Sequence, residues 1–106
     1  MKHYDYNKEW NDKHRDIIEE RQRIVCAANR HKITGRIICG ARHWDAVMRS
    51  QLQKGEDHFD FDQGFLTNYQ EFKTREEAWV IAEKNNQIIK LCYEGQKDYL
   101  YSENCW

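Results

Sequence analysis

Asp62-Gln63-Gly64-Phe65 and Thr74-Arg75-Glu76-Glu77-Ala78 are the two motifs that decide the fold of this chain. We expect the first to form a tight turn that runs into an aromatic residue. The second is typical of a helix start, because the Thr74 side chain can accept a hydrogen bond from a first-turn N–H while Glu77 reaches back. This capping box predicts a helix that begins at Arg75.

Arg75 is the exception within this helix start, because a cation in the first turn opposes the helix dipole. Its guanidinium therefore suggests an anion held beside the free N–H groups of the helix start. The alternative is that Arg75 is solvated at the surface or pairs with a nearby carboxylate. The sequence leaves both interpretations open.

The length of 106 residues predicts a single domain over 1–106. Charged residues make up 33% of the chain and aromatic residues 13%, a combination typical of a folded, soluble protein. No apolar run approaches the roughly 18 residues that a membrane span requires. The polar and aromatic segment Met1–Trp10 does not resemble a signal peptide, so we expect the protein to stay in the cytosol.

The net charge of −1 argues against non-specific binding to nucleic acid, which depends on many lysine and arginine contacts to phosphate. A local basic pocket for one small anionic ligand remains compatible with this charge. The four cysteines, Cys26, Cys39, Cys92 and Cys105, form no C-x-x-C pair, so neither a disulfide framework nor a zinc site is indicated. We expect free, mostly buried thiols.

Hydrophobic periodicity predicts an α+β fold: a small antiparallel sheet with about three helices, including a charged N-terminal helix. That helix spans 7–23, and one narrow face carries Trp10, His14, Ile17, Ile18 and Arg21. So narrow a stripe favours packing on a partner chain, as an assembly element, or on the edge of the domain. A role in the core of a single chain is the alternative. Residues 24–106 would form an α+β ligand-binding core.

The other predicted elements are strands at 24–28 and 36–40, a helix at 41–53, strands at 64–67 and 71–72, a helix at 75–85, and a strand or extended connection at 87–91. The first two strands form a hairpin whose turn contains Gly35. The two helices are expected to bury Trp44, Val47, Met48 and Leu52, and Ala78, Ile81 and Ala82, respectively. We expect Trp106 to be docked, because an exposed indole is costly.

The motif Gly40-Ala41-Arg42-His43-Trp44-Asp45 places a cation, an imidazole and an indole where a strand meets a helix. Helix starts bind phosphate through free N–H groups, and Arg42 can pair with a phosphate through two parallel hydrogen bonds. His43 can add a hydrogen bond and, near neutral pH, a partial positive charge. The alternative is that His43 satisfies a backbone carbonyl and Trp44 packs in the core.

Together these side chains describe a nucleotide-binding pocket without catalytic apparatus. We expect Phe65 and Phe72, or Trp44, to frame an adenine, Arg42, His43 and Arg75 to hold a pyrophosphate, and Asn86 and Gln87 to contact base or ribose. No catalytic residue, metal or cofactor is expected. The chain has no G-x-S-x-G, H-E-x-x-H or Gly-rich phosphate loop, and its acidic stretch at 55–62 lacks calcium-binding spacing.

The order of these pieces resembles the Thoeris anti-defence sponge proteins of phages, of the first-described type. The resemblance covers roughly residues 23–106 and lies in Ile24–Ala28, Gly40–Asp45, Asp62–Phe65, Phe72, Arg75–Ala78, Ile81, Ala82, Gln87, Leu100–Asn104 and Trp106. It implies a small non-enzymatic phage protein that acts in the cytoplasm of the infected bacterial host. Such proteins bind cyclic ADP-ribose isomers, including glycocyclic ADP-ribose, and hold this immune signal intact so that the defence effector is not activated.

The resemblance also implies a homo-oligomer, a dimer that can build a hexamer. For some members it implies a separate site for the cyclic oligonucleotides of CBASS defence, such as cyclic trinucleotides. Two other functions stay open. One is a phage inhibitor that binds a protein partner through the helix at 7–23. The other is a small nucleotide-cleaving enzyme that uses His43, with Asp45 and His31 as candidate partners. Neither nucleic acid nor a membrane is an expected partner.

Overall fold

The computed structural model describes residues 6–106; the first part of the segment in which we expected no signal peptide, residues 1–5, lies outside this range. The strands are β1 (Ile24–His31), β2 (Ile37–Gly40), β3 (Phe61–Thr67) and β4 (Phe72–Thr74). The helices of the described range are α1 (Tyr6–Lys13), α2 (Arg15–Arg21), α3 (Ala46–Ser50), α4 (Arg75–Lys84) and α5 (Ser102–Cys105), with a 3-10 helix at His58–Asp60. The predicted α+β class is confirmed, with more helices in this range than the three expected.

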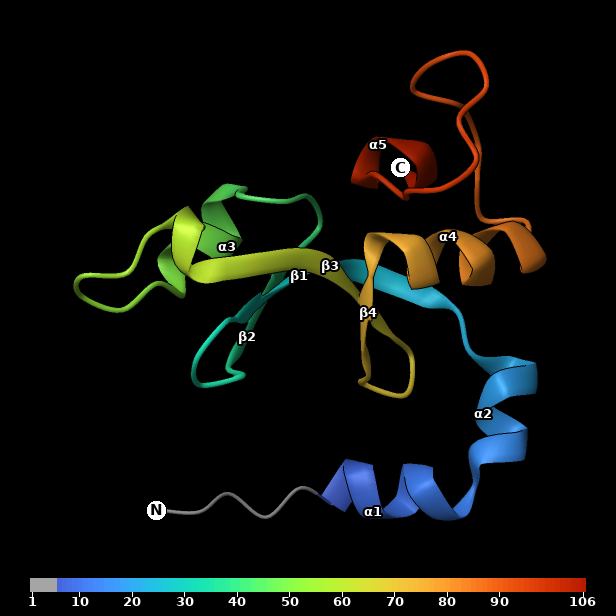
Figure 1. Cartoon of the computed structure of the whole chain (residues 1–106), viewed down its shortest axis with the longest axis horizontal. Coiled ribbons are helices and arrows are strands. Elements are labelled where there is room, and N and C mark those ends of the chain that lie inside the picture. Colours follow the sequence, from blue (N-terminus) through green and yellow to red (C-terminus); the bar gives the residue numbers. More distant parts are fainter. Residues whose placement is uncertain (1–5) are drawn as a thin grey trace.

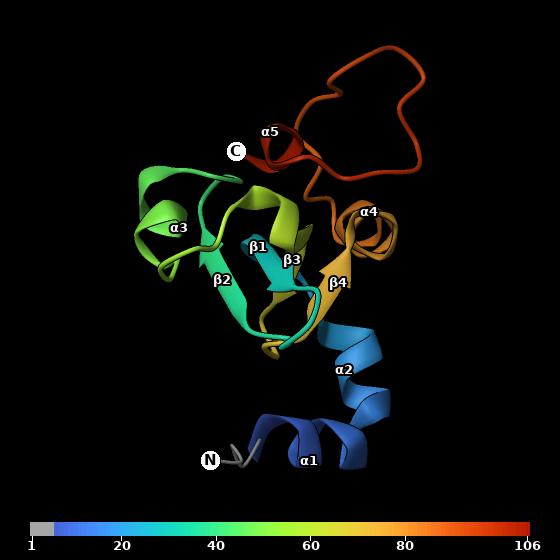
Figure 2. The same cartoon turned by 60° about the vertical axis from the view of Figure 1, so that its left-hand side comes forward.

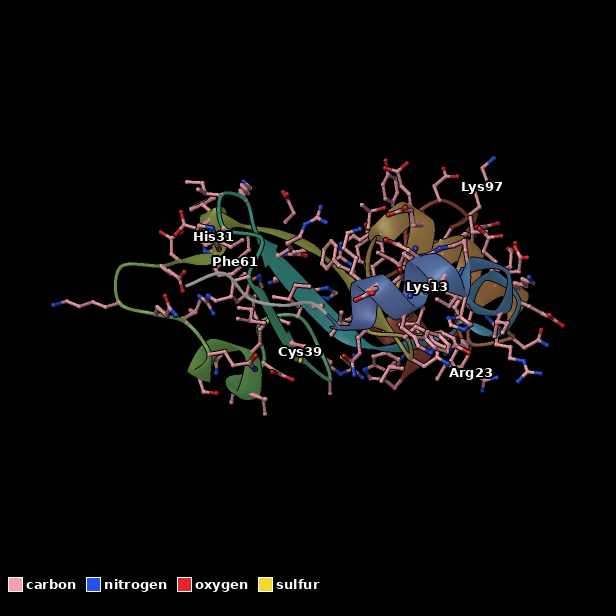
Figure 3. The ribbon with its side chains drawn as sticks, turned by 90° about the horizontal axis from the view of Figure 1, so that it is seen from below. Lys13, Arg23, His31, Cys39, Phe61 and Lys97 are labelled. Carbon is pink, nitrogen blue, oxygen red and sulfur yellow. The ribbon has the colours of Figure 1, made fainter. Side chains whose placement is uncertain are left out.

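One antiparallel sheet, in the strand order β2-β1-β3-β4, separates two unlike sides of the molecule (Figure 1). The core lies between the sheet, the helices α3 and α4, and the C-terminal segment, residues 100–106. The N-terminal arm, residues 6–21, comprises α1 and α2. Its α1 lies on the opposite side of the sheet from α5 (Figure 2), whereas α2 meets the end of α4, where the Lys84 ammonium donates to the Glu19 carbonyl oxygen at 3.3 Å. Seen from below, α1 lies in front of the sheet (Figure 3). The arm therefore covers a region that the core helices leave open.

The predicted hairpin is confirmed, because β1 and β2 pair antiparallel with Ala28 opposite Cys39. The turn was expected to begin at Asn29, but β1 continues to His31. The strand is longer because β3 pairs with it over the same residues, on its other edge. In addition, the fully buried Asn29 amide donates to the Met48 sulfur at 3.3 Å. Arg30 therefore belongs to the sheet and not to a loop.

The expectation of a tight turn at 62–65 is wrong, because these residues lie inside β3 and pair with β1. Gly64 lies opposite Ala28 on one edge and opposite Thr74 on the other. A Cβ at Gly64 would come within 2.5 Å of the Cζ atom of Phe72. The glycine therefore marks the close approach of a ring to the backbone of a strand.

The capping box at the start of α4 is confirmed in both directions. The Glu77 N–H donates to Thr74 Oγ1 at 3.2 Å, and the Thr74 N–H donates to Glu77 Oε1 at 3.0 Å. The predicted buried face is also confirmed, with Ala78, Ile81 and Ala82 packed in the core. Trp79 is buried as well.

The charged N-terminal helix is two helices, because the chain leaves helical geometry at His14, where φ is −120° and ψ is 33°. The His14 ring stacks on Trp10 with 4.0 Å between centroids, and its Nδ1 contacts the Trp10 carbonyl oxygen at 2.7 Å. Such local side-chain bonds compete with helical hydrogen bonding. Ile18 is fully buried, whereas Trp10 is 45% exposed. Ile18 thus anchors α2 in the protein, whereas Trp10 of α1 stays accessible.

The helix expected at 41–53 is shorter, because Asp45 caps it and Trp44 has a left-handed φ of 59° that a continuous helix does not accept. Met48 is buried as predicted, but Val47 is 61% exposed, so its assignment to the buried face is wrong. The segment 87–91 forms no strand and is an extended connection. Within this segment, the Ile89 N–H donates to the Asn104 carbonyl oxygen at 2.8 Å.

The environments of Trp106 and of the four cysteines were also predicted from the sequence. Trp106 is docked as predicted, because its indole N–H donates to the Ala41 carbonyl and its ring packs against the core. All four thiols are free, as expected. They are not mostly buried, since Cys92 is exposed and Cys26, Cys39 and Cys105 are partly accessible.

Within residues 6–106, no helix combines the length and the apolar character that a membrane crossing needs.

Candidate functional site

Arg42, His43 and Arg75 do come together, and they meet at the C-terminal segment. Arg42 donates through Nη2 to the carbonyl oxygen of Trp106, and its Nη1 lies 3.7 Å from a carboxylate oxygen of Glu103. The Arg42 side chain remains 44% exposed. The three predicted anion contacts thus share one region, but the chain's own groups already occupy Arg42.

His43 is held as a neutral ring. Its Nε2–H donates to the Gly64 carbonyl oxygen at 2.7 Å, and its Nδ1 lies 3.4 Å from the Ser102 hydroxyl. Burial, and then the positive charge of Arg75, lower the pKa of His43 to about 4. The expected partial charge near neutral pH is therefore wrong. The alternative, that His43 satisfies a backbone carbonyl, is confirmed.

Arg75 uses its guanidinium to tie three segments together. Its Nη1 donates to the Leu100 carbonyl at 2.7 Å, and its Nη2 donates to Oε1 of Gln63. Its Cζ lies 4.7 Å from the centroid of the Tyr101 ring. Burial lowers the pKa of Arg75, which stays charged at neutral pH. Arg75 is partly exposed and lies in the field of the Glu103 carboxylate, but its hydrogen bonds go to Leu100 and Gln63.

Among the other predicted ligand residues, Phe65 touches this cluster: its ring lies edge-on to the His43 ring, with 5.0 Å between centroids. Phe65 is fully buried in the core, and Trp44 packs edge-on against Phe61 with 5.8 Å between centroids. The Gln87 amide bonds both backbone groups of Ile24: it accepts from the N–H at 2.9 Å and donates to the carbonyl at 2.7 Å. These three side chains therefore support the fold.

Asn86 lines a separate cavity of about 290 Å³. That cavity lies between α4 and the irregular segment that follows it, with Trp79, Ile88, Leu91 and Gln96 among its walls. Asn86 itself has a left-handed φ of 57°, which asparagine tolerates better than most residues. The structure thus places Asn86 and Phe72 in different cavities.

Phe72 lines a cavity on the side of the sheet away from the core. We call it the sheet-face cavity; it has a volume of about 370 Å³ and is lined by Lys8, Asn11, Arg30, Ile37, Gln70, Glu71, Phe72 and Lys73. Arg30 lies opposite Ile37 in the β1–β2 pair, so both project on the side of the sheet away from the core. The Arg30 guanidinium covers the Phe72 ring, with 4.5 Å from Cζ to the ring centroid.

The charges around this cavity are predominantly positive. Its lining contains the cations Lys8, Arg30 and Lys73 and one carboxylate, Glu71. Arg15 binds that carboxylate through two hydrogen bonds of 2.8 and 2.6 Å, and this bond lowers the Glu71 pKa. Glu71 is therefore ionised and compensated by Arg15. Lys8 is itself paired with Asp12 at 2.9 Å, so Arg30 and Lys73 are the cations that give the cavity its positive potential.

Sequence reasoning missed Arg30 because it ended the first strand at Ala28, and it assigned no ligand role to Ile37 or Lys73. The signal that could have found Arg30 is the alternation of the strand, which puts residues 26, 28 and 30 on one side of the sheet. Ile37 follows from the hairpin register. Lys73 needs the position of β4, whose residues carry little periodic signal.

The residues of the enzyme alternative do not meet. His31 accepts from the N–H groups of Ile33 and Thr34, whereas Asp45 accepts from the Met48 N–H as the α3 cap. His43 lies on Gly64, as described above. Across residues 6–106 there is no grouping of three or more His, Cys, Asp or Glu residues that could hold a metal ion.

Comparison with curated proteins and with solved structures gave no match. A family model described as "Phage T4 y16D protein" matches residues 23–106. The matched region contains the sheet, α3, α4, α5 and the residues of both the cation cluster and the sheet, and it excludes the N-terminal arm. This chain belongs to the phage T4 y16D protein family.

Proposed function

We propose that this phage-family protein binds a cyclic nucleotide immune signal, glycocyclic ADP-ribose, and sequesters it without cleaving it. It acts in the cytoplasm of the infected bacterial host and keeps the signal from the defence effector. Two findings support this proposal. The protein belongs to a phage family, and the matched residues 23–106 are the same region that carries the resemblance to Thoeris anti-defence sponges.

The observation that carries the proposal is the Arg30–Phe72 pair in the sheet-face cavity. An aromatic face stacks a purine, and a guanidinium binds phosphate or covers the exposed side of a base. A volume of about 370 Å³ lies within the range of small-ligand sites. Lys73 adds positive charge for the pyrophosphate, and Lys8, which pairs with Asp12 at 2.9 Å, lines the wall of the cavity. Phe72 keeps its expected stacking role, and Arg30 takes the anion role that we first assigned to Arg42.

Sequestration requires tight binding and slow release, and it requires no turnover. To keep a signal at sub-micromolar concentration from its receptor, the protein needs a dissociation constant of roughly nanomolar. This corresponds to a binding free energy of about −12 kcal/mol. One stacked ring, several cation–phosphate contacts and a preformed wall are compatible with such an affinity. We propose that the protein does so as a homo-oligomer, a dimer or hexamer, and that a cyclic trinucleotide is a second ligand.

The cation cluster of Arg42, His43 and Arg75 is the second candidate position for the pyrophosphate. Its donors already bind the carbonyls of Trp106, Gly64 and Leu100. A ligand would have to displace the C-terminal segment there, so the sheet-face cavity is the better supported site.

The test is incubation of the protein with glycocyclic ADP-ribose, removal of free ligand, heat denaturation, and chromatography of what is released. Depletion before heating, with intact ligand recovered afterwards, is the expected result. Altered ligand would make the protein an enzyme, and the His43→Ala variant would then be tested for turnover. If the ligand is not depleted, glycocyclic ADP-ribose is ruled out as the ligand. Cyclic trinucleotides would then be tested, and after them binding to a protein partner.

The site is tested with Arg30→Ala and Phe72→Leu. Each should weaken binding by about tenfold or more, since each removes one face of the stacked pair. Arg23→Ala is the matched control, because Arg23 is also exposed and lies outside the cavity lining. Unchanged affinity in both cavity variants, with lost affinity in Arg42→Ala, would place the ligand in the cation cluster instead.

A further inference from the structure

The N-terminal arm is not covered by the family match, yet it forms one side of the sheet-face cavity. Lys8 and Asn11 of α1 line the cavity together with Arg30 and Phe72 of the sheet. The family match begins at residue 23, so the arm lies outside the matched α+β core. A wall that comes from outside the core can change how long a ligand stays without changing the surface on which it stacks.

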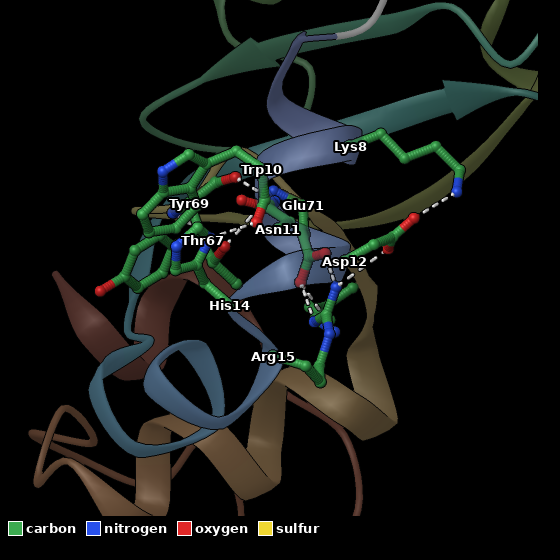
Figure 4. Close-up of polar contacts among 10 residues, drawn as sticks. Lys8, Trp10, Asn11, Asp12, His14, Arg15, Thr67, Tyr69 and Glu71 are labelled. Carbon is green, nitrogen blue, oxygen red and sulfur yellow. Dashed lines mark hydrogen bonds and ion pairs between the residues drawn. The ribbon is translucent and has the colours of Figure 1, made fainter.

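The arm is fastened to the turn between β3 and β4 by a polar latch (Figure 4). Arg15 makes a two-pronged ion pair with Glu71, at 2.8 and 2.6 Å. Asn11, only 4% exposed, donates from Nδ2 to the Tyr69 carbonyl at 2.9 Å. Such a paired, planar geometry is more specific than a surface contact between single charges.

Stacked rings extend the latch. Trp10 stacks on His14 and also lies nearly parallel to Tyr69, at 6.1 Å between centroids and 12° between planes. Fully or almost fully buried side chains are few in the arm: among its described residues they are Ile18 and Asn11. An element with so few buried contacts opens at a lower free-energy cost than the core.

The latch also sets the charge of the cavity. Glu71 lines the cavity and lies 3.6 Å from Lys73, so it is within reach of the cations that would hold a phosphate. Arg15 compensates this carboxylate. Without Arg15, Glu71 would compete with the phosphate for Lys73 and repel the anion.

We propose that the N-terminal arm is a retaining wall for the bound anionic ligand, and that the Arg15–Glu71 pair holds it closed and sets the ligand's residence time. The inference rests on the proposed function, because it assigns the arm a role at that same site. Arg15 and Glu71 are positioning residues. Their ion pair keeps Lys8 and Asn11 of α1 against the cavity, and it keeps the Glu71 carboxylate from competing with the ligand for Lys73.

The test is the dissociation rate of glycocyclic ADP-ribose from the full chain, measured by competition in stopped flow. Arg15→Ala should raise this rate by about tenfold or more with a smaller change in the association rate. Glu71→Ala should raise it as well, because the latch opens even though the repulsive carboxylate is gone. The double exchange Arg15→Glu with Glu71→Arg should restore slow release, which a general loss of stability would not allow.

Lys13→Ala is the matched control, since Lys13 pairs with Glu9 inside the arm and not with the turn. Hydrogen exchange of the α1 and α2 amides in the absence of ligand provides a second readout, and it should accelerate in Arg15→Ala but not in Lys13→Ala. A wild-type protein that binds no glycocyclic ADP-ribose would overturn the proposed function and this inference with it. Binding by the wild type with the same release rate in Arg15→Ala or Glu71→Ala would overturn the role of the arm alone.

Discussion

The ring of Phe72 occupies the space where a side chain of Gly64 would lie. A Cβ at position 64 would be 2.5 Å from Phe72 Cζ, and the Lys73 carbonyl oxygen lies against the same point. Gly64 thereby lets the ring come close to the backbone of the sheet, where the Arg30 Cζ lies 4.5 Å from the ring centroid. The base-stacking surface of the proposed site depends on this missing side chain.

Gly64→Ala is expected to destabilise the protein by about 1–3 kcal/mol, because the added methyl group forces the ring or the strand to move. Urea denaturation followed by circular dichroism measures this change. Phe72→Leu in the same background should recover only a part of the loss, since the Lys73 carbonyl is backbone and cannot turn away. A Gly64→Ala variant as stable as the wild type would show that the strands separate easily at this point.

The pH dependence of stability should report on His43. Its pKa of about 4 in the folded protein lies below the ordinary value of 6.5, so the unfolded chain binds the proton more readily. The stability is therefore fully present above pH 6.5 and falls as the pH decreases toward 4, by on the order of 2–3 kcal/mol. Urea unfolding between pH 4.5 and 7.5 should show a flatter profile for His43→Gln. An equally steep profile in this variant would assign the effect to other groups.

Arg75 and Arg42 should differ sharply in their contribution to folding. Arg75→Ala removes a part-buried bond to Leu100 and an exposed bond to Gln63, and is expected to cost about 1.5–3 kcal/mol. Arg42→Ala, at a half-exposed position, should cost less than about 1 kcal/mol. The thermal unfolding midpoints of both variants measure this difference. Arg75→Lys is a third variant, which keeps the positive charge but loses the paired N–H donors of the guanidinium. Equal midpoints for the two alanine variants would contradict the assignment.

Gln87→Ala should act on stability and not on the ligand. The substitution leaves the N–H and the carbonyl of Ile24 without their side-chain partners, at a cost of about 1–3 kcal/mol. Affinity for glycocyclic ADP-ribose, measured by calorimetry below the melting range, should stay within about twofold. Gln53→Ala, at an exposed position, is the control. If Gln87→Ala lowers the affinity and leaves the stability unchanged, Gln87 contacts the ligand, as we first expected.

The sequence by itself determined the elements whose signals are local. Thr74 and Glu77 cap α4 as their spacing predicts, and Ala78, Ile81 and Ala82 are buried because a helix brings residues three and four apart to one face. The hairpin of β1 and β2 follows from two β-branched runs separated by Gly35. These features depend on neighbours in the chain.

Only the tertiary structure decided where the strands end and which side chains share a cavity. Asn29 is in a strand because it finds a buried partner in Met48, and Asp62–Phe65 is in a strand because β1 and β4 lie on both sides. Arg30 and Phe72 are 42 positions apart in the chain and meet across the sheet. Hydrogen bonds between strands and contacts between distant side chains have no local period, so the sequence pattern showed the cations and rings without showing which of them meet.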